Sequence, residues 1–131
     1  MSDASTTTEM LIEVMPRDLN SAGLIDTAAY LRWVQAVVIR HWERFASKAA
    51  QDSTLWSAVK HVVSHEAAGR HEDHLVAHTR IKKLKGVRAL FITTVTSGEK
   101  LLAEIESTWV CLDSSTKLPK ALDPEVVRNF L

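Results

Sequence analysis

The chain has 131 residues with 46% hydrophobic content, which suits one domain built around one core. Its 16 basic residues balance 16 acidic residues, so no overall field attracts nucleic acid or an anionic membrane, and any anion binding must be local. The single cysteine, Cys111, excludes an intrachain disulfide, and its apolar surroundings in the sequence indicate a core residue rather than a nucleophile.

The N-terminal residues 1–8 are polar and acidic, and we predict a flexible tail there. They lack the basic start and the apolar run of a signal peptide. No stretch approaches the roughly 18 consecutive apolar residues that a membrane span requires. We therefore expect a cytoplasmic protein without a membrane span.

A strand is predicted from Leu11 to Met15, because its residue types favour strands and the following Pro16 lacks the backbone donor that pairing requires. Asp18 would lie at the exit of this strand. The next residues, Asn20 to Gly23, favour a turn.

Asp26 or Thr27 can cap a helix that begins near Ala28. The turn would bring the carboxylate of Asp18 close to the unpaired amides of the helix start. A base beside such donors suits attack on a carbonyl, because the donors can hold the developing oxyanion. The alternative is that Asp18 only hydrogen-bonds its own turn.

From Ala28 to about Ala49, apolar residues recur every three or four positions, which is the helical period. The polar stripe that remains is narrow. We therefore predict a long helix that is buried on most of its circumference. The periodic apolar residues are Leu31, Val34, Val38, Trp42, Phe45 and Ala49, and the stripe contains Arg32, Arg40, Glu43, Arg44 and Ser47.

Four further strands are predicted from β-type composition and alternation. They cover Trp56–Glu66, Leu75–Leu84, Ala89–Thr96 and Leu101–Leu112. The connections between the last three are short, which permits only antiparallel neighbours. The expected fold class is α+β, with one long helix against a five-stranded, mainly antiparallel sheet.

Two histidine pairs, His61/His65 and His74/His78, have the spacing of a helical metal site. Both pairs fall in predicted strands, where four residues span about 13 Å, so the two rings of a pair cannot reach one ion. We predict no metal site.

The segment from Lys82 to Lys85, with Arg88, is the only local group of basic residues. It falls at a predicted hairpin. A solvated turn that protects a sheet end against aggregation is one interpretation, and a local anion site is the other.

The pattern Asp-x-x-x-x-Gly-x-Ile/Val-x-x-x-x-Tyr-x-x-Trp resembles the signature of the hotdog-fold thioesterases of the 4-hydroxybenzoyl-CoA thioesterase type. Later segments, from Val62 to Leu84 and from Leu101 into the tail KLPKALDPEVV, also resemble this family. The resemblance implies one hotdog domain over residues 1–131, in which a sheet wraps a long central helix. The motif residues are Asp18, Gly23, Ile25, Tyr30 and Trp33.

The resemblance also implies an activity, the hydrolysis of an acyl-CoA or acyl-carrier-protein thioester. Asp18 would be the general base or a nucleophile, and the amides of Leu24, Ile25 and Asp26, after Gly23, would hold the carbonyl oxygen. Ser64 matches a serine near the family's active site. The implied substrate contacts are Tyr30, Trp33 and His65 for the acyl part and Lys83, Lys85 and Arg88 for the coenzyme A phosphates.

No cofactor is expected, because coenzyme A enters as part of the substrate. Relatives place their active sites between two subunits, so a homodimer or a dimer of dimers is expected. Many relatives carry His and Asn where this chain has Leu24 and Ala29. A non-catalytic hotdog protein that binds an apolar or acyl ligand is the alternative, and a dehydratase is disfavoured because Leu24 replaces a histidine.

Overall fold

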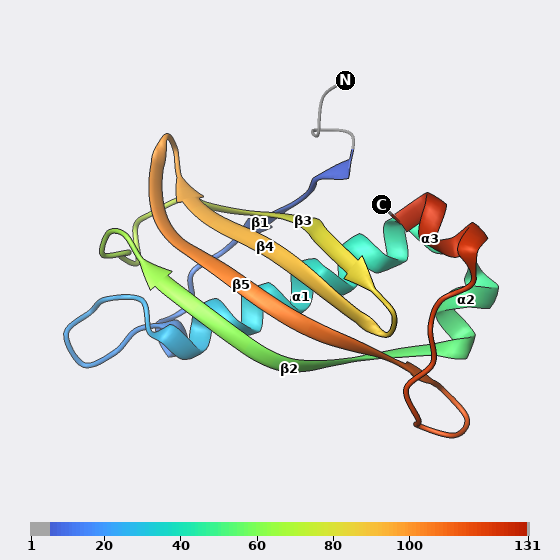
Figure 1. Ribbon diagram of the computed structural model, residues 1–131. Helices are drawn as coiled ribbons and strands as arrows, with labels where there is room; N and C mark the ends of the chain where they lie inside the picture. The colour runs from blue at the N-terminus through green and yellow to red at the C-terminus, as the bar shows by residue number, and fades with distance from the viewer. Residues whose placement is uncertain (1–5, 131) are drawn as a thin grey trace.

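The computed structural model describes residues 6–130. A long helix, α1 (Thr27–Phe45), lies across one face of a five-stranded antiparallel sheet (Figure 1), which confirms the predicted fold class. The sheet order is β1-β3-β4-β5-β2. Its strands are β1 (Thr8–Ile12), β2 (Thr54–His65), β3 (Leu75–Lys85), β4 (Arg88–Ser97) and β5 (Lys100–Asp113). The described residues also form three shorter helices: η2 (Pro16–Asp18), α2 (Lys48–Ser53) and α3 (Pro124–Phe130).

The first strand begins and ends earlier than the sequence suggests. β1 pairs with β3 from Thr8 opposite Thr79 to Ile12 opposite Leu75, where β3 itself begins, so the ladder has no partner beyond Ile12. Thr8 is buried in this strand, and the prediction of a tail through residue 8 is therefore wrong at that residue. Residues 1–5 of the predicted tail lie outside the described part of the chain.

The long helix begins where the capping signals predict. Asp26 is its N-cap, and a side-chain oxygen of Asp26 accepts a hydrogen bond of 3.3 Å from the amide of Ala28. The helix ends at Phe45 rather than near Ala49, because Ser47 caps a second helix, α2, through a bond of 3.2 Å from the amide of Ala50. The sequence did not reveal α2 or α3.

The helix buries one face against the sheet. The buried residues of α1 are Ala29, Tyr30, Val34, Val37, Val38, His41 and Trp42. Residues on the opposite side, such as Gln35 and Glu43, are exposed. Burial on most of the circumference was thus a wrong expectation, because a single sheet covers only one side of the helix within one chain. Cys111 is buried in the core as predicted, and burial raises the pKa of its thiol to about 11.

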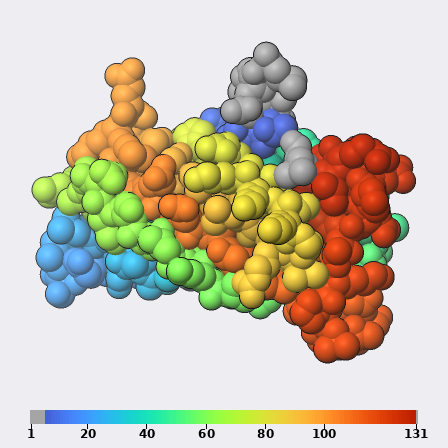
Figure 2. Space-filling model, in the orientation of Figure 1, coloured from blue at the N-terminus to red at the C-terminus, as the bar shows by residue number. Residues whose placement is uncertain are grey.

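The outer face of the sheet, on the side away from α1, forms much of the surface in Figure 2. β2 is an edge strand, and its residues Leu55, Val59 and Val62 are exposed apolar side chains. No helix in the described part of the chain is long and apolar enough to span a membrane.

Candidate active site

A cleft of about 350 Å³, here called the α1 cleft, opens beside the N-terminus of α1. Two segments form it: the turn before α1 and the end of β2 with the loop that follows. The amide of Ile25 bonds to the carbonyl of Gly69 at 2.9 Å, which ties the two segments together. The lining residues are Asn20, Leu24, Ile25, Tyr30, His65, Glu66, Ala67, Ala68 and Gly69.

His65 and Tyr30, two of the predicted substrate contacts, meet in this cleft. The ring centroids lie 5.6 Å apart in an edge-on arrangement, and Nε2 of His65 lies 3.1 Å from the hydroxyl of Thr27. His65 is the last residue of β2, and its side chain lies on the strand face that looks toward α1. Ser64 therefore points to the opposite face, because side chains alternate along a strand. Ser64 does not line the α1 cleft, and its role near an active site stays a prediction.

Asp18 is not among the residues that line the α1 cleft. It is 3% exposed, and both of its carboxylate oxygens have partners. One oxygen accepts a 2.6 Å bond from Arg32 and the other a 2.8 Å bond from the amide of Met15. In this geometry Asp18 holds its own turn, which is the alternative that the sequence left open.

The main-chain donors predicted for the oxyanion are also engaged. The amide of Leu24 bonds to the side chain of Asn20 at 3.1 Å, that of Ile25 bonds to Gly69, and that of Asp26 bonds to the carbonyl of Asp18 at 2.8 Å. Donors that already have an acceptor cannot hold a substrate oxygen without breaking that bond. The acceptor of the Ile25 amide could not be predicted from the sequence, since Gly69 lies in a segment distant in the chain.

Asn20 is a cleft residue that the sequence suggested only as a turn former. Its side-chain oxygen accepts bonds from the amides of Ala22 and Leu24, which shapes the turn at the cleft wall. Gly23 adopts φ of +78° in this turn, a conformation that favours glycine, and it does not line the cleft. Gly69 was missed altogether, because nothing in its local pattern marks a wall of a cleft.

Tyr30 lies at the base of the cleft and is 1% exposed. Its hydroxyl has no hydrogen-bond partner among the described residues. Burial raises the pKa of Tyr30, and the charge of Asp73 raises it further, so the phenol keeps its proton at neutral pH. Trp33 packs edge-on against Tyr30 at 5.4 Å but does not line the cleft, so it supports Tyr30 instead of contacting a ligand there.

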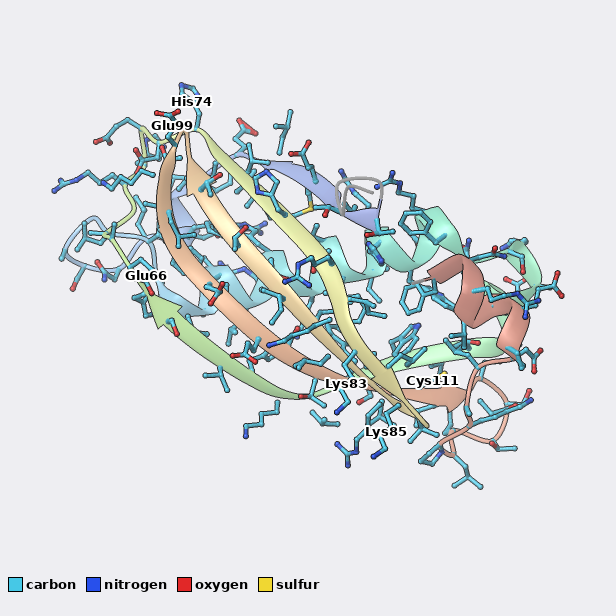
Figure 3. The ribbon with its side chains drawn as sticks, turned by 45° about the horizontal axis from the view of Figure 1, so that its top comes forward. Glu66, His74, Lys83, Lys85, Glu99 and Cys111 are labelled. Carbon is cyan, nitrogen blue, oxygen red and sulfur yellow. The ribbon has the colours of Figure 1, made fainter. Side chains whose placement is uncertain are left out.

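The predicted basic residues gather at the other end of the sheet. Lys83, Lys85 and Arg88 line a shallow pocket of about 220 Å³ on β3 and β4. Val95 of β4 and His65 of β2 lie in one row of the sheet, since both are level with Ala103 of β5. Arg88 lies seven positions from Val95 along β4, which is about 23 Å at 3.3 Å per residue. Figure 3 shows Glu66 at the end of β2 and the two lysines well apart from it.

The histidines do not assemble into a metal centre within residues 6–130. No group of three or more His, Cys, Asp or Glu side chains in this range has the geometry to hold an ion. His61 lies edge-on to Trp109 and His78 pairs with Glu9 at 2.8 Å, so both are placed by other contacts.

Comparisons with known proteins agree on one family, the thioesterases. Residues 14–130 match the model of the thioesterase-like superfamily. An Escherichia coli protein described as acyl-CoA thioester hydrolase YbgC is 27% identical over 124 residues, which cover 91% of this chain and 92% of that protein.

Solved structures share the fold. A thioesterase from Thermus thermophilus, complexed with coenzyme A and zinc, has a TM-score of 0.82 at 16% identity, covering 94% of this chain and 96% of that one. A 1,4-dihydroxy-2-naphthoyl-CoA thioesterase from Synechocystis has a TM-score of 0.76 at 17% identity, covering 95% and 94%. The fold is thus the hotdog fold that the sequence motif implied.

Proposed function

The chain belongs to the thioesterase-like superfamily, and from this premise we propose that it hydrolyses acyl-CoA thioesters to a free acid and free coenzyme A. The observation that carries the proposal is the family match over residues 14–130. It is supported by the relative described as an acyl-CoA thioester hydrolase and by the solved neighbour that binds coenzyme A. An acyl-carrier-protein thioester is the rival substrate, since it presents the same thioester.

The reaction is assigned to the α1 cleft. Water adds to the carbonyl carbon, its proton passes to a base, the carbon–sulfur bond breaks, and the sulfur leaves as thiolate. A thiol has a pKa of about 8.5, so its thiolate leaves without a strong general acid. No cofactor is needed for this chemistry beyond the coenzyme A that the substrate carries.

Glu66 is the base in this proposal. It is the one carboxylate among the described residues that line the α1 cleft, and it is exposed to the water that would attack. His65 is held by Thr27 beside it and forms a polar wall. Asp18 acts as a positioning residue, because its bonds to Arg32 and to the Met15 amide fix the turn that carries Asn20 and Leu24 to the cleft.

The basic pocket of Lys83, Lys85 and Arg88 is proposed to contact the nucleotide phosphates. In coenzyme A the pantetheine arm separates these phosphates from the thioester. The pocket lies on the outer face of the sheet, about 23 Å along β4 from the row of His65, whereas the α1 cleft lies on the face toward α1.

A homodimer is proposed as the minimal assembly. β2 is an edge strand with exposed apolar residues, and natural proteins seldom leave such an edge unpaired. A dimer of dimers would be built from the same pair. We also propose a cytoplasmic location, which suits the single free cysteine.

The test is release of free thiol from a panel of short, long and aromatic acyl-CoAs, measured with a thiol reagent. Turnover of at least one member, at a rate well above spontaneous hydrolysis, supports the proposal. Tight binding without turnover across the whole panel would move the protein to the non-catalytic, acyl-binding class.

A further inference from the structure

The hydroxyl of Tyr30 is a buried donor without an acceptor. Its oxygen is inaccessible to solvent and has no hydrogen-bond partner within residues 6–130. Other buried hydroxyls of this chain are paired: those of Thr79 and Thr93 bond each other at 2.8 Å, and that of Ser107 accepts from Trp109 at 3.1 Å. Leaving a buried polar group unpaired is costly, so an exception at the base of a cleft points to a ligand.

On the side of the cleft this hydroxyl is covered by a glycine, Gly69, which has no side chain. Gly69 faces it across the cleft wall, and a Cβ atom at Gly69 would lie 3.0 Å from the hydroxyl oxygen and 2.5 Å from Cδ1 of Ile25. Any larger residue would therefore crowd the phenol. The ring itself is held on two sides by edge-on contacts with Trp33 and His65, so the hydroxyl has a defined position.

The three main-chain donors that the sequence suggested for a carbonyl oxygen are already engaged. The amides of Leu24, Ile25 and Asp26 all have acceptors within the chain. A reaction that builds negative charge on an oxygen gains most from a donor that is already in place, because no reorganisation is then needed. Tyr30 meets this requirement, and the raised pKa of its phenol keeps the donor protonated.

We propose that the Tyr30 hydroxyl donates the hydrogen bond that holds the thioester carbonyl oxygen while water attacks. This inference rests on the proposed hydrolysis and names a side-chain donor for the oxyanion. The phenol shares its proton with the oxyanion and keeps it when the carbonyl re-forms, so no covalent change occurs at Tyr30. The carbonyl carbon then faces Glu66 and His65 at the cleft rim.

Tyr30→Phe is the direct test, with Thr93→Val as the matched control, since each removes one buried hydroxyl. Thiol release should show kcat lowered about 10²- to 10³-fold in Tyr30→Phe, with KM within about threefold of the wild-type value. Its urea midpoint should equal or exceed that of the wild type, because the lost hydroxyl had no partner. Thr93→Val should show the reverse pattern, with a lower midpoint and an unchanged kcat.

Gly69→Ala provides a second variant that leaves the phenol in place. The added methyl group would sit over the hydroxyl, so kcat should fall while the tyrosine remains. A Tyr30→Phe protein with wild-type kcat would overturn the inference, and so would a loss seen only in KM.

A carbonyl-labelled ketone analogue of acyl-CoA, with methylene in place of sulfur, separates this inference from the proposed hydrolysis. Its ¹³C carbonyl resonance should move downfield on binding to the wild type, and this shift should be lost in Tyr30→Phe. If the wild type hydrolyses no thioester but still shows the shift, only the hydrolase proposal fails. An identical shift in both proteins overturns the role of Tyr30, and no binding by the wild type overturns both.

Discussion

Asp18 and Arg32 form an ion pair of 2.6 Å in which the carboxylate is buried and the side chain of Arg32 remains 48% exposed. The pair joins the 3-10 turn η2 to the first half of α1. The second carboxylate oxygen accepts a bond from the Met15 amide, so both oxygens of Asp18 have partners. The pair thus sets the angle at which the chain enters the helix.

Asp18→Asn is expected to lower stability rather than chemistry. Replacing a buried carboxylate that accepts charged and main-chain hydrogen bonds should cost about 1.5–3 kcal/mol in the free energy of unfolding. Urea titration measures this loss, and kcat at low temperature should stay within about threefold of the wild-type value. Arg32→Gln breaks the same pair and should give a loss of similar direction. A stable Asp18→Asn protein with kcat reduced 10²-fold or more would restore Asp18 as the base.

Glu66→Gln should remove the base while keeping the shape of the cleft. The expected result is a kcat reduced about 10²- to 10⁴-fold with KM nearly unchanged, as for loss of a general base. Glu104→Gln is the control, since Glu104 is an exposed carboxylate opposite Ser64 on the other face of the sheet. If His65→Gln lowers kcat and Glu66→Gln does not, the imidazole is the base.

Replacing Lys83, Lys85 and Arg88 together by alanine should weaken the binding of substrates that carry the nucleotide. Exposed ion pairs contribute about 0.2–1 kcal/mol each, so the loss of three should raise KM for acyl-CoA by about 3- to 150-fold. KM for the wild type should also rise with salt, since these charges are screened over about 8–10 Å. Pantetheine thioesters lack the nucleotide phosphates and should show neither effect. Equal losses on both substrates would assign the cluster another role.

The proposed dimer predicts an effect of charge at the β2 edge. Val59 and Val62 are 50% and 47% exposed, and lysine at both positions would place like charges across a symmetric interface. Light scattering at micromolar concentration should give a dimer mass for the wild type and a monomer mass for this variant. Leu118→Lys is the control, because Leu118 is 64% exposed but lies in the C-terminal segment. A wild-type monomer would contradict the proposed assembly.

His41 should make stability depend on pH. It is fully buried, its Nδ1 lies 2.8 Å from the hydroxyl of Thr8, and burial lowers its pKa from 6.5 to about 4. The unfolded chain therefore binds more protons than the folded chain between pH 4 and 6.5, so stability rises with pH across this window and is fully present above it.

The stability lost at this site on going from pH 7 to 4 is at most about 3 kcal/mol, at 1.36 kcal/mol per unit of pKa difference. Urea titrations at several pH values should show a flatter dependence for His41→Gln than for the wild type. His71→Gln, at an exposed loop position, should leave the slope unchanged. Parallel curves for wild type and His41→Gln would contradict the buried neutral ring.

The sequence alone determined the architecture of this protein, because that information is local. The apolar period marks α1, alternation marks the strands, and the Asp26 cap marks where the helix begins. The motif around Gly23 and Tyr30 identified the family for the same reason, since its residues lie within one turn and one helix. The ends of β1 and α1 escaped prediction because they depend on where a partner strand begins and on the cap at Ser47.

Only the tertiary structure decided which residues share the site. The turn at Asn20 and the loop at Gly69 are about fifty residues apart in the chain, and a hydrogen bond between Ile25 and Gly69 brings them together. That contact uses the amide of Ile25, one of the three that local reasoning left free, while the Arg32 side chain pairs with the carboxylate of Asp18. Hydrogen-bond donors and acceptors are shared across the whole fold, so which ones remain for a substrate cannot be read from any single stretch of sequence.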